Sequence, residues 1–251
     1  MEIYGNFAEV YDMFMDNIPY DEWGRYVKKL LNKYDVKNGI VLDLGCGTGT
    51  MTEILADAGY DMIGVDNSQD MLNVAIDKKY ESGNDILYLL QDMREFELYG
   101  TVAAIVSICD SINYITEFDD LVKVFSLVNN YLDPDGVFIF DMNTMHKYES
   151  MGDSVIAENR DNASFIWDNT YYKDTHINEY ELTLFIEDGN GKFDRFNECH
   201  LQRAYTIDEV KKALDLAGLK FLASYDAFTE KEIKQESERM YIVARENGKV
   251  K

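Results

Sequence analysis

An apolar segment around residue 42 runs directly into a glycine-rich turn. The stretch VLDLGCGTGTM, residues 41–51, carries a carboxylate at Asp43 and then three glycines in quick succession: Gly45, Gly47 and Gly49. Glycine in a strand-to-helix turn lets the backbone approach another group closely. A nicotinamide or flavin site would read G-x-G-x-x-G, whereas this chain has Thr50 in place of the third glycine. The turn therefore predicts close contact with a ligand of another kind.

Further carboxylates follow the next apolar runs. Asp66 ends the run DMIGVD, where a strand-end carboxylate can accept the hydroxyls of a ribose. Asp92 and Met93 follow the third run, where they could hold an adenine amino group and ring, and Asp110 follows the fourth. Because the carboxyl ends of parallel strands meet at one sheet edge, we expect these acids to converge with Asp43. They would repel a pyrophosphate and suit a ligand that carries a sulfonium and an amino group.

The apolar runs that position these residues alternate with amphipathic stretches. The runs predict strands at residues 40–44, 61–66, 86–90, 102–109 and 136–142, and the stretches predict helices at 50–59, 68–82 and 118–132. Two further helices are expected before them, at 6–15 and 20–34. This alternation predicts an α/β fold with a doubly wound, mostly parallel sheet of the Rossmann-like type.

After residue 144 the sequence becomes rich in aromatic and β-branched residues. Long aromatic and β-branched segments follow at 164–174, 177–188 and 192–205, and DGNG at 188–191 predicts a hairpin turn. Thr206 and Glu209 are then spaced as the capping box of a helix that ends at Gly218. Candidate closing strands lie at 219–228 and 239–246. We therefore expect a core of residues 1–143 and 206–251, with a small antiparallel β insertion at 144–205 covering the substrate pocket.

Composition excludes several classes of partner. The 251 residues carry 47 acidic and 24 basic side chains, a formal net charge of −23, so nucleic acid and anionic membranes are not expected to bind. No apolar run approaches the length of a membrane span, and the first residues lack a signal pattern. Cys46, Cys109 and Cys199 are widely spaced and form no CxxC pair, which argues against a disulfide framework and structural zinc. A cytoplasmic protein is expected.

The three motifs VLDLGCGTG, GVDNS and QDMREF resemble the first three motifs of class I S-adenosylmethionine-dependent methyltransferases, in the same order and spacing. The segments YGNFAEVYDMFMDNIPYDEW and ECHLQRAYT resemble those of bacterial small-molecule methyltransferases that carry a β insertion over the active site. The resemblance covers most of the chain. It implies S-adenosyl-L-methionine as cofactor, S-adenosyl-L-homocysteine as product, and a small-molecule N or O acceptor.

The resemblance also implies roles for individual residues. The glycines would approach the methionine part, Asp43 would receive its amino group directly or through water, Asp66 would hold the ribose and Asp92 with Met93 the adenine. A closing N-terminal helix makes Tyr4 and Tyr20 further candidates. The full set of implied cofactor contacts is Tyr11, Trp23, Asp43, Gly45, Gly47, Gly49, Asp66, Asn67, Asp92, Met93, Cys109 and Asp110. The implied substrate contacts are Asn113, Asn143 and Arg203.

Methyl transfer from a sulfonium is an in-line displacement in which the cofactor supplies the reactive group and the protein holds donor and acceptor in line. A base is needed only where the acceptor must lose a proton. His200 and Asp141 are the candidate catalytic residues, although His200 could instead be hydrogen-bonded within the insertion sheet. Strand alternation puts His200 on the face of Glu198 and Gln202, opposite Arg203.

Four alternatives stay open or are set aside. A protein acceptor, and a cofactor-binding protein without turnover, both fit the same motifs. A nicotinamide oxidoreductase is opposed by Thr50 and by the acidic sheet edge. The pair Asp168-Asn169 resembles the ligands of metal-dependent methyltransferases but lies inside a predicted insertion strand rather than at a core strand end, so no metal is expected.

Overall fold

A computed structural model describes residues 8–249 of the chain. The helices are α1 (Ala8–Phe14), α2 (Tyr20–Lys33), α3 (Thr50–Asp57), α4 (Gln69–Ser82), the 3₁₀ helix η1 (Ser111–Tyr114), α5 (Phe118–Tyr131), α6 (Met145–Met151) and α7 (Ile207–Leu216). The strands are β1 (Ile40–Leu44), β2 (Asp61–Asp66), β3 (Ile86–Leu90), β4 (Val102–Ser107), β5 (Leu132–Asn143), β6 (Ser154–Asn159), β7 (Ala163–Tyr172), β8 (Ile177–Glu187), β9 (Phe193–Arg203), β10 (Leu219–Asp226) and β11 (Arg239–Glu246).

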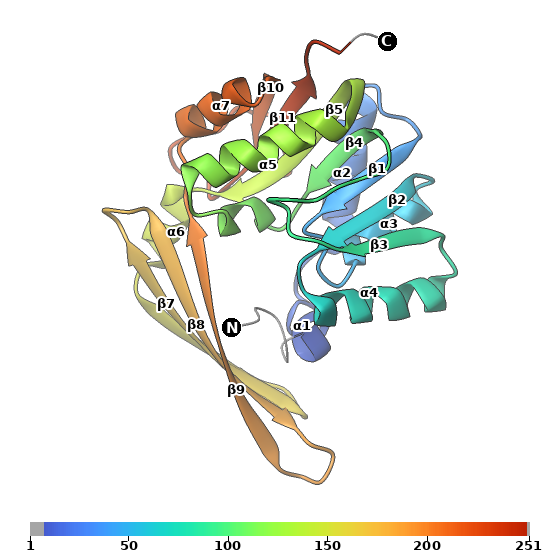
Figure 1. The fold of residues 1–251 in the computed structure, drawn as a ribbon. Coiled ribbons are helices and arrows are strands. Elements are labelled where there is room, and N and C mark those ends of the chain that lie inside the picture. The colour runs from blue at the N-terminus through green and yellow to red at the C-terminus, as the bar shows by residue number, and fades with distance from the viewer. Residues whose placement is uncertain (1–7, 250–251) are drawn as a thin grey trace.

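Seven strands form the core sheet in the order β10-β11-β5-β4-β1-β2-β3 (Figure 1). β1 to β5 pair in parallel, β11 pairs antiparallel with β5, and β10 pairs antiparallel with β11 at the sheet edge. The strand order reverses between β1 and β4, where ligands of open α/β sheets bind. The predicted fold class, a mostly parallel Rossmann-like sheet with an antiparallel β insertion, is confirmed.

Apolar residues bury both faces of the core sheet. On β1, Leu42 and Leu44 belong to the hydrophobic cluster that includes α5 and α7, whereas Val41 belongs to the cluster that includes α2 and α3. This alternation explains the continuous apolar run in the sequence, because a parallel strand covered on both sides has no solvent face. Asp43 points to the same side as Val41, toward α3.

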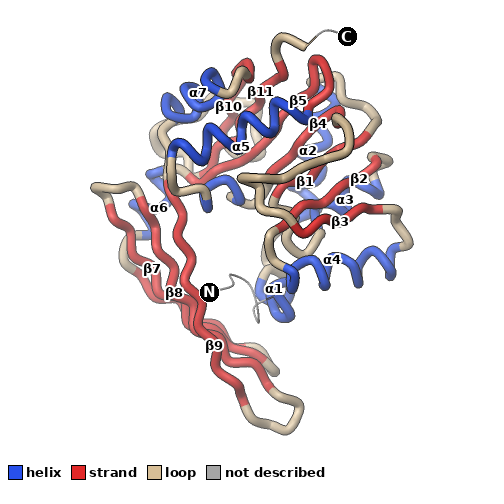
Figure 2. Tube along the Cα trace, in the orientation of Figure 1, coloured by secondary structure: helices blue, strands red, loops and turns tan. Residues whose placement is uncertain are grey.

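The second sheet has the order β6-β7-β8-β9 and is antiparallel throughout. Figure 1 shows it as a twisted yellow-to-orange arm beside the core, and Figure 2 shows its strands in red with the hairpin turn at its far end. It packs on two helices: Val10 and Phe14 of α1 contact Leu182 and Leu184, and Tyr148 of α6 stacks on Tyr171.

Two elements of the insertion were missed by the sequence prediction. α6 and β6 lie between Met145 and Asn159, where no strand or helix was expected. β6 pairs only with β7 at the sheet edge, and its side chains at 155–157 are exposed, so the segment lacks the alternation that marks a half-buried strand.

In the core sheet, β4 ends two residues before the predicted end, because Cys109 and Asp110 turn the chain with φ values of 64° and 52°.

A partly buried ion cluster, with the fully buried Asp141 at its centre, joins three strands at the end of the core sheet. Arg239 on β11 forms ion pairs with Asp141 on β5 and, at 2.7 Å, with Asp110 after β4. The backbone N–H of Asp110 donates to Asp141 at 3.0 Å, and the guanidinium lies 5.1 Å from the centre of the Trp23 ring. Burial raises the pKa of the fully buried Asp141 carboxyl, an effect that Arg239 opposes. The cluster therefore holds the turn after β4 in place.

Removing Arg239 should destabilise the fold strongly. Arg239→Ala leaves Asp141 buried without its cation, and we expect a loss of about 3–5 kcal/mol in the free energy of unfolding. Lys147→Ala is the matched control, because Lys147 pairs at 2.9 Å with Glu238 through half-exposed side chains and should cost less than about 1 kcal/mol. Urea unfolding measures both variants, and equal losses would contradict a structural role for the cluster.

Candidate active site

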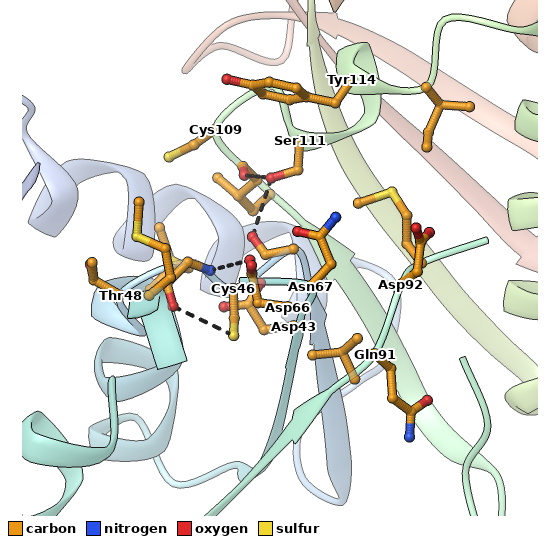
Figure 3. A pocket seen from close by; sticks show the side chains of 18 of the residues that line it. Asp43, Cys46, Thr48, Asp66, Asn67, Gln91, Asp92, Cys109, Ser111 and Tyr114 are labelled. Carbon is orange, nitrogen blue, oxygen red and sulfur yellow. Dashed lines mark hydrogen bonds between the residues drawn. The ribbon is translucent and has the colours of Figure 1, made fainter. Parts of the chain in front are cut away.

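A cavity of about 380 Å³ lies at the carboxyl ends of β1 to β4 (Figure 3). Nine of the predicted cofactor contacts line it: Tyr11, Asp43, Gly45, Gly47, Asp66, Asn67, Asp92, Met93 and Cys109. Figure 3 shows Gln91 and Asp92 on one side of the site and Cys109, Ser111 and Tyr114 across from them. The edge of the insertion sheet reaches the cavity through Cys199 and Leu201 on β9.

The glycine-rich turn after β1 packs closely against β2 and η1. The N–H groups of Gly45 and Cys46 donate to the carbonyl of Val65 on β2, at 2.8 and 3.0 Å. Gly45 has a φ of +81°, and a Cβ there would lie 2.8 Å from the Cβ of Ser111. Glycine is therefore required at this position for both its backbone angle and its lack of a side chain.

Asp66 is held rigidly at the end of β2. One carboxylate oxygen accepts from the N–H of Gly47 at 2.8 Å and the other from the N–H of Ser68 at 2.9 Å. Each oxygen keeps a further lone pair for a ligand hydroxyl. Burial raises the pKa of the Asp66 carboxyl, and the backbone hydrogen bonds oppose the shift. The arrangement fits the ribose of a nucleoside cofactor.

Asp43 lies deep in the cavity wall, only 2% exposed. The hydroxyl of Thr52 on α3 donates to its carboxylate at 2.7 Å. Burial raises the pKa of Asp43 to about 7, and the charge of Asp66 contributes to the same shift. A carboxyl in such a position gains from a cationic partner, so Asp43 fits the ammonium group of a ligand.

Asp92 has a different environment from the other two carboxylates. The Arg94 backbone N–H and Nε each donate to Asp92 Oδ1, at 2.8 and 2.9 Å. These hydrogen bonds from Arg94 lower the pKa of the Asp92 carboxyl. Asp92 is therefore charged and partly engaged before any ligand binds, and the neighbouring Met93 offers an apolar surface in the cavity wall.

Tyrosines and a thiol form the other end of the cavity. Tyr11, Tyr20 and Cys109 lie together there: Tyr20 hydrogen-bonds to Tyr11 and to Cys109, and Tyr114 lines the same cavity. Burial raises the pKa of the Tyr11 and Tyr20 phenols and of the Cys109 thiol. These groups are therefore neutral around pH 7. Tyr4, another sequence candidate, lies outside the described residues.

A polar clamp that the sequence prediction missed ties α1 to the glycine turn. Asp12 accepts from the hydroxyl of Thr48 at 2.7 Å and pairs with Lys78 of α4 at 2.6 Å. Lys78 also donates to the hydroxyls of Thr48 and Thr50. The threonines of the GTGT segment were the available signal, since two hydroxyls next to a ligand turn need partners.

Several predicted site residues do not line the cavity. Asp110 and Asp141 belong to the ion cluster with Arg239, and Trp23 packs against that guanidinium. Gly49 faces Tyr88, whose hydroxyl would lie 2.5 Å from an added Cβ. Asp110 and Asp141 thus share one guanidinium inside the protein, and the carboxylates that line the cavity are Asp43 on β1, Asp66 on β2 and Asp92 just after β3.

The predicted substrate contacts are likewise engaged inside the fold. Asn113 is fully buried, donates to the carbonyls of Asn143 and Arg203, and accepts from the N–H of Asn143. The Arg203 guanidinium donates to the carbonyl of Thr116 and pairs with Glu209 at 3.1 Å. These contacts join η1, β5 and β9, so they connect the two sheets behind the cavity.

His200 lies on the predicted face of β9, with Glu198 and Gln202. It is 4% exposed, whereas Leu201 on the opposite face is 45% exposed, so the expected alternation is confirmed. Its ring does not line the cavity but contacts Tyr114, which does. Within residues 8–249, no cluster of His, Cys, Asp and Glu side chains is arranged to hold a metal, and no helix is long and apolar enough to cross a membrane.

The sheet order and the residues around the cavity are those of the class I S-adenosylmethionine-dependent methyltransferases. Comparison with known proteins assigns the chain to this family. Residues 41–136 match the family described as methyltransferase domain. The chain is 34% identical over 247 residues to YqeM of Bacillus subtilis (strain 168), a protein named as a methyltransferase, with 98% of both chains covered. It belongs to this family of enzymes, whose cofactor is S-adenosyl-L-methionine.

Two further comparisons extend over most of the chain. The crystal structure of an S-adenosylmethionine-dependent methyltransferase from Clostridium acetobutylicum ATCC 824 aligns with a TM-score of 0.86 and 30% identity, covering 98% of this chain and 99% of that one. The dTDP-3-amino-3,4,6-trideoxy-alpha-D-glucopyranose N,N-dimethyltransferase of Streptomyces venezuelae is 24% identical over 218 residues, covering 85% of this chain and 90% of that protein.

Substitution of Gly45 should disrupt the cofactor site. Gly45→Ala combines a positive φ with a clash against Ser111, so we expect at least about tenfold weaker binding of S-adenosylhomocysteine and a stability loss of about 1–3 kcal/mol. Gly59→Ala is the control, because Gly59 has a φ of +95° and nothing within 4 Å of an added Cβ. Calorimetric titration of both variants checks the comparison. Unchanged binding in Gly45→Ala would show that the turn does not need this close approach.

Proposed function

We propose that this methyltransferase transfers the methyl group to a nitrogen or oxygen atom of a small molecule. The observation that carries the proposal is the shape of the site: a cavity of about 380 Å³, bordered on the acceptor side by Tyr11, Tyr20 and Tyr114 and by the edge strand β9. A bound cofactor would occupy much of that volume, so the space beside it suits a small acceptor. The insertion, residues 144–205, serves as the cover of this pocket.

The residues around the cavity support a defined cofactor arrangement. In this proposal Asp66 and Asn67 hold the ribose, Asp92 and Met93 the adenine, and Asp43 the amino group of the methionine part. Gly45 and Gly47 give the backbone room beside the sulfur. The cofactor supplies an activated methyl group on a sulfonium, and the chain holds an acceptor in line with it and excludes water.

The charge of the cavity wall and the similarity to a sugar methyltransferase support a small acceptor that carries an amine or a hydroxyl. The cavity wall contains Asp43, Asp66 and Asp92, and its one arginine, Arg94, is paired with Asp92. The Streptomyces venezuelae relative is named as an N,N-dimethyltransferase of an amino sugar nucleotide. The net charge of −23 disfavours nucleic acid as the acceptor. We place the enzyme in the cytoplasm, where its three free cysteines would stay reduced.

Isotope-labelled S-adenosylmethionine tests the proposal directly. The purified protein is incubated with the labelled cofactor and a bacterial cell extract that is separated into small-molecule and macromolecular fractions. We expect label in the small-molecule fraction, and less of it with Gly45→Ala when the labelled cofactor is not saturating. Label confined to protein would contradict the small-molecule proposal and favour a protein methyltransferase.

Cofactor binding should depend on pH through Asp43. The pKa of Asp43 is about 7 in the free protein, and the ionised form is the one that attracts an ammonium group, so binding must be accompanied by proton loss below that pH. We expect affinity for S-adenosylhomocysteine to be about tenfold lower at about pH 6 than at about pH 7.5. Asp43→Asn should bind more weakly and lose this dependence. An unchanged pH profile in Asp43→Asn would rule out Asp43 as the titrating group.

A further inference from the structure

Three side chains form a continuous polar path from the insertion sheet to the cavity. Glu198 Oε2 lies 3.0 Å from Nε2 of His200, and Nδ1 of the same ring lies 3.4 Å from the hydroxyl of Tyr114. The rings of Tyr114 and His200 meet edge to face at 6.0 Å. Tyr114 lines the cavity, whereas the other two residues lie behind it. The path therefore ends where an acceptor would be held.

Glu198 and His200 are ionisable side chains that are almost completely buried, which is costly for folding. Glu198 is 7% exposed and His200 is 4% exposed, so two ionisable side chains of this strand lie inside the protein. Burying a carboxylate is costly unless it is hydrogen-bonded and paired. The next residue on this face, Gln202, has a structural role, since it accepts from Tyr148 and donates to Asp110. Glu198 and His200 instead face each other at 3.0 Å, and the ring of His200 leads on to the hydroxyl of Tyr114.

We propose that Tyr114 is the catalytic residue that takes the proton from the methyl acceptor, and that His200 and Glu198 are the positioning residues that make it a base. The inference rests on the proposed function and identifies the acceptor class as an amine or hydroxyl that binds in its protonated form. An amine cannot attack a methyl group while its lone pair carries a proton, so such a substrate requires this step.

The proton balance of the relay follows from the two hydrogen bonds. In this relay His200 carries its ring proton on Nε2 and donates it to Glu198, and Nδ1 accepts from the Tyr114 hydroxyl. The acceptor's N–H or O–H bond breaks as its proton moves to Tyr114, and the Tyr114 proton moves to Nδ1. The resulting imidazolium is stabilised by the carboxylate of Glu198. The 3.4 Å step is the length expected before substrate tightens the site.

The other polar groups near the cavity are less suited to this role. Asp141 is paired with Arg239 and does not reach the cavity. Tyr11, Tyr20 and Cys109 also border the acceptor end, but they hydrogen-bond in a chain in which Tyr20 is the middle member and burial keeps each of them neutral. Tyr114 is the phenol of this group whose hydroxyl has an imidazole nitrogen as its partner.

The tautomer of His200 gives a test that needs no acceptor. The full-length protein, labelled with ¹⁵N-histidine and saturated with S-adenosylhomocysteine, is measured by NMR at neutral pH, and the His200→Asn spectrum assigns its signals. The chain has three histidines, so the spectrum is simple. We expect the proton on Nε2 in the wild type and in Glu198→Gln, whose amide oxygen can still accept it. A proton on Nδ1, in the other tautomer or in the imidazolium, would overturn the relay.

The rate of methyl transfer gives the second readout. With labelled cofactor and the small-molecule fraction as acceptor source, Tyr114→Phe should lower the initial rate about 100-fold while leaving the Kd for S-adenosylhomocysteine within about twofold. Glu198→Gln should lower the rate about tenfold, because it keeps the tautomer but lacks the charge that stabilises the imidazolium. Tyr80→Phe, at a 79% exposed tyrosine, is the matched control and should retain the wild-type rate.

The outcomes separate this inference from the proposed function. Wild-type rates in Tyr114→Phe, with cofactor binding intact, would overturn the role of Tyr114 and leave the small-molecule methyltransferase standing. A wild-type protein that labels nothing in the small-molecule fraction would overturn the proposed function instead. In that case the position of the His200 proton still decides whether the relay exists.

Discussion

The ion pairs of Arg239 with Asp110 and Asp141 set the geometry of the side of the cavity that η1 forms. They fix the turn in which Cys109 and Asp110 leave β4 with positive φ values, and this turn leads directly into η1. η1 then supplies Ser111, which lies against the glycine turn and donates to the carbonyl of Gly45 at 3.2 Å. The turn after β4 and the glycine turn after β1 are thus linked to Arg239 through Asp110 and Ser111.

The insertion is joined to the core by hydrogen bonds as well as by apolar packing. Asn113 bonds to β5 and β9 at once, and Gln202 reaches from β9 to Asp110. Because these bonds are buried or partly buried, breaking one leaves a polar group poorly satisfied, which costs more than losing an exposed contact. The insertion sheet therefore presents β9 to the cavity at a defined distance rather than as a loosely attached arm.

The sequence predicted most of the fold and about half of the candidate site, for identifiable reasons. Local periodicity was enough for β1 to β5, and strand-end position was enough for Asp43 and Asp66. Asp110 occupies an equivalent strand-end position, yet it is paired with an arginine 129 positions further along the chain. That pairing depends on the strand order β11-β5-β4, which no local pattern contains. β6 was missed because it is an edge strand with no buried face to impose alternation.

The three cysteines are potential nucleophiles close to a methyl donor, because all of them line the cavity. The thiolate, not the thiol, is the nucleophile, and burial raises the pKa of Cys46, Cys109 and Cys199. Nearby carboxylates, Asp43 and Asp66 for Cys46, Asp141 for Cys109 and Glu179 for Cys199, act in the same direction. Burial, reinforced by these carboxylates, thus keeps the three thiols in the protonated, weakly nucleophilic form beside the methyl donor.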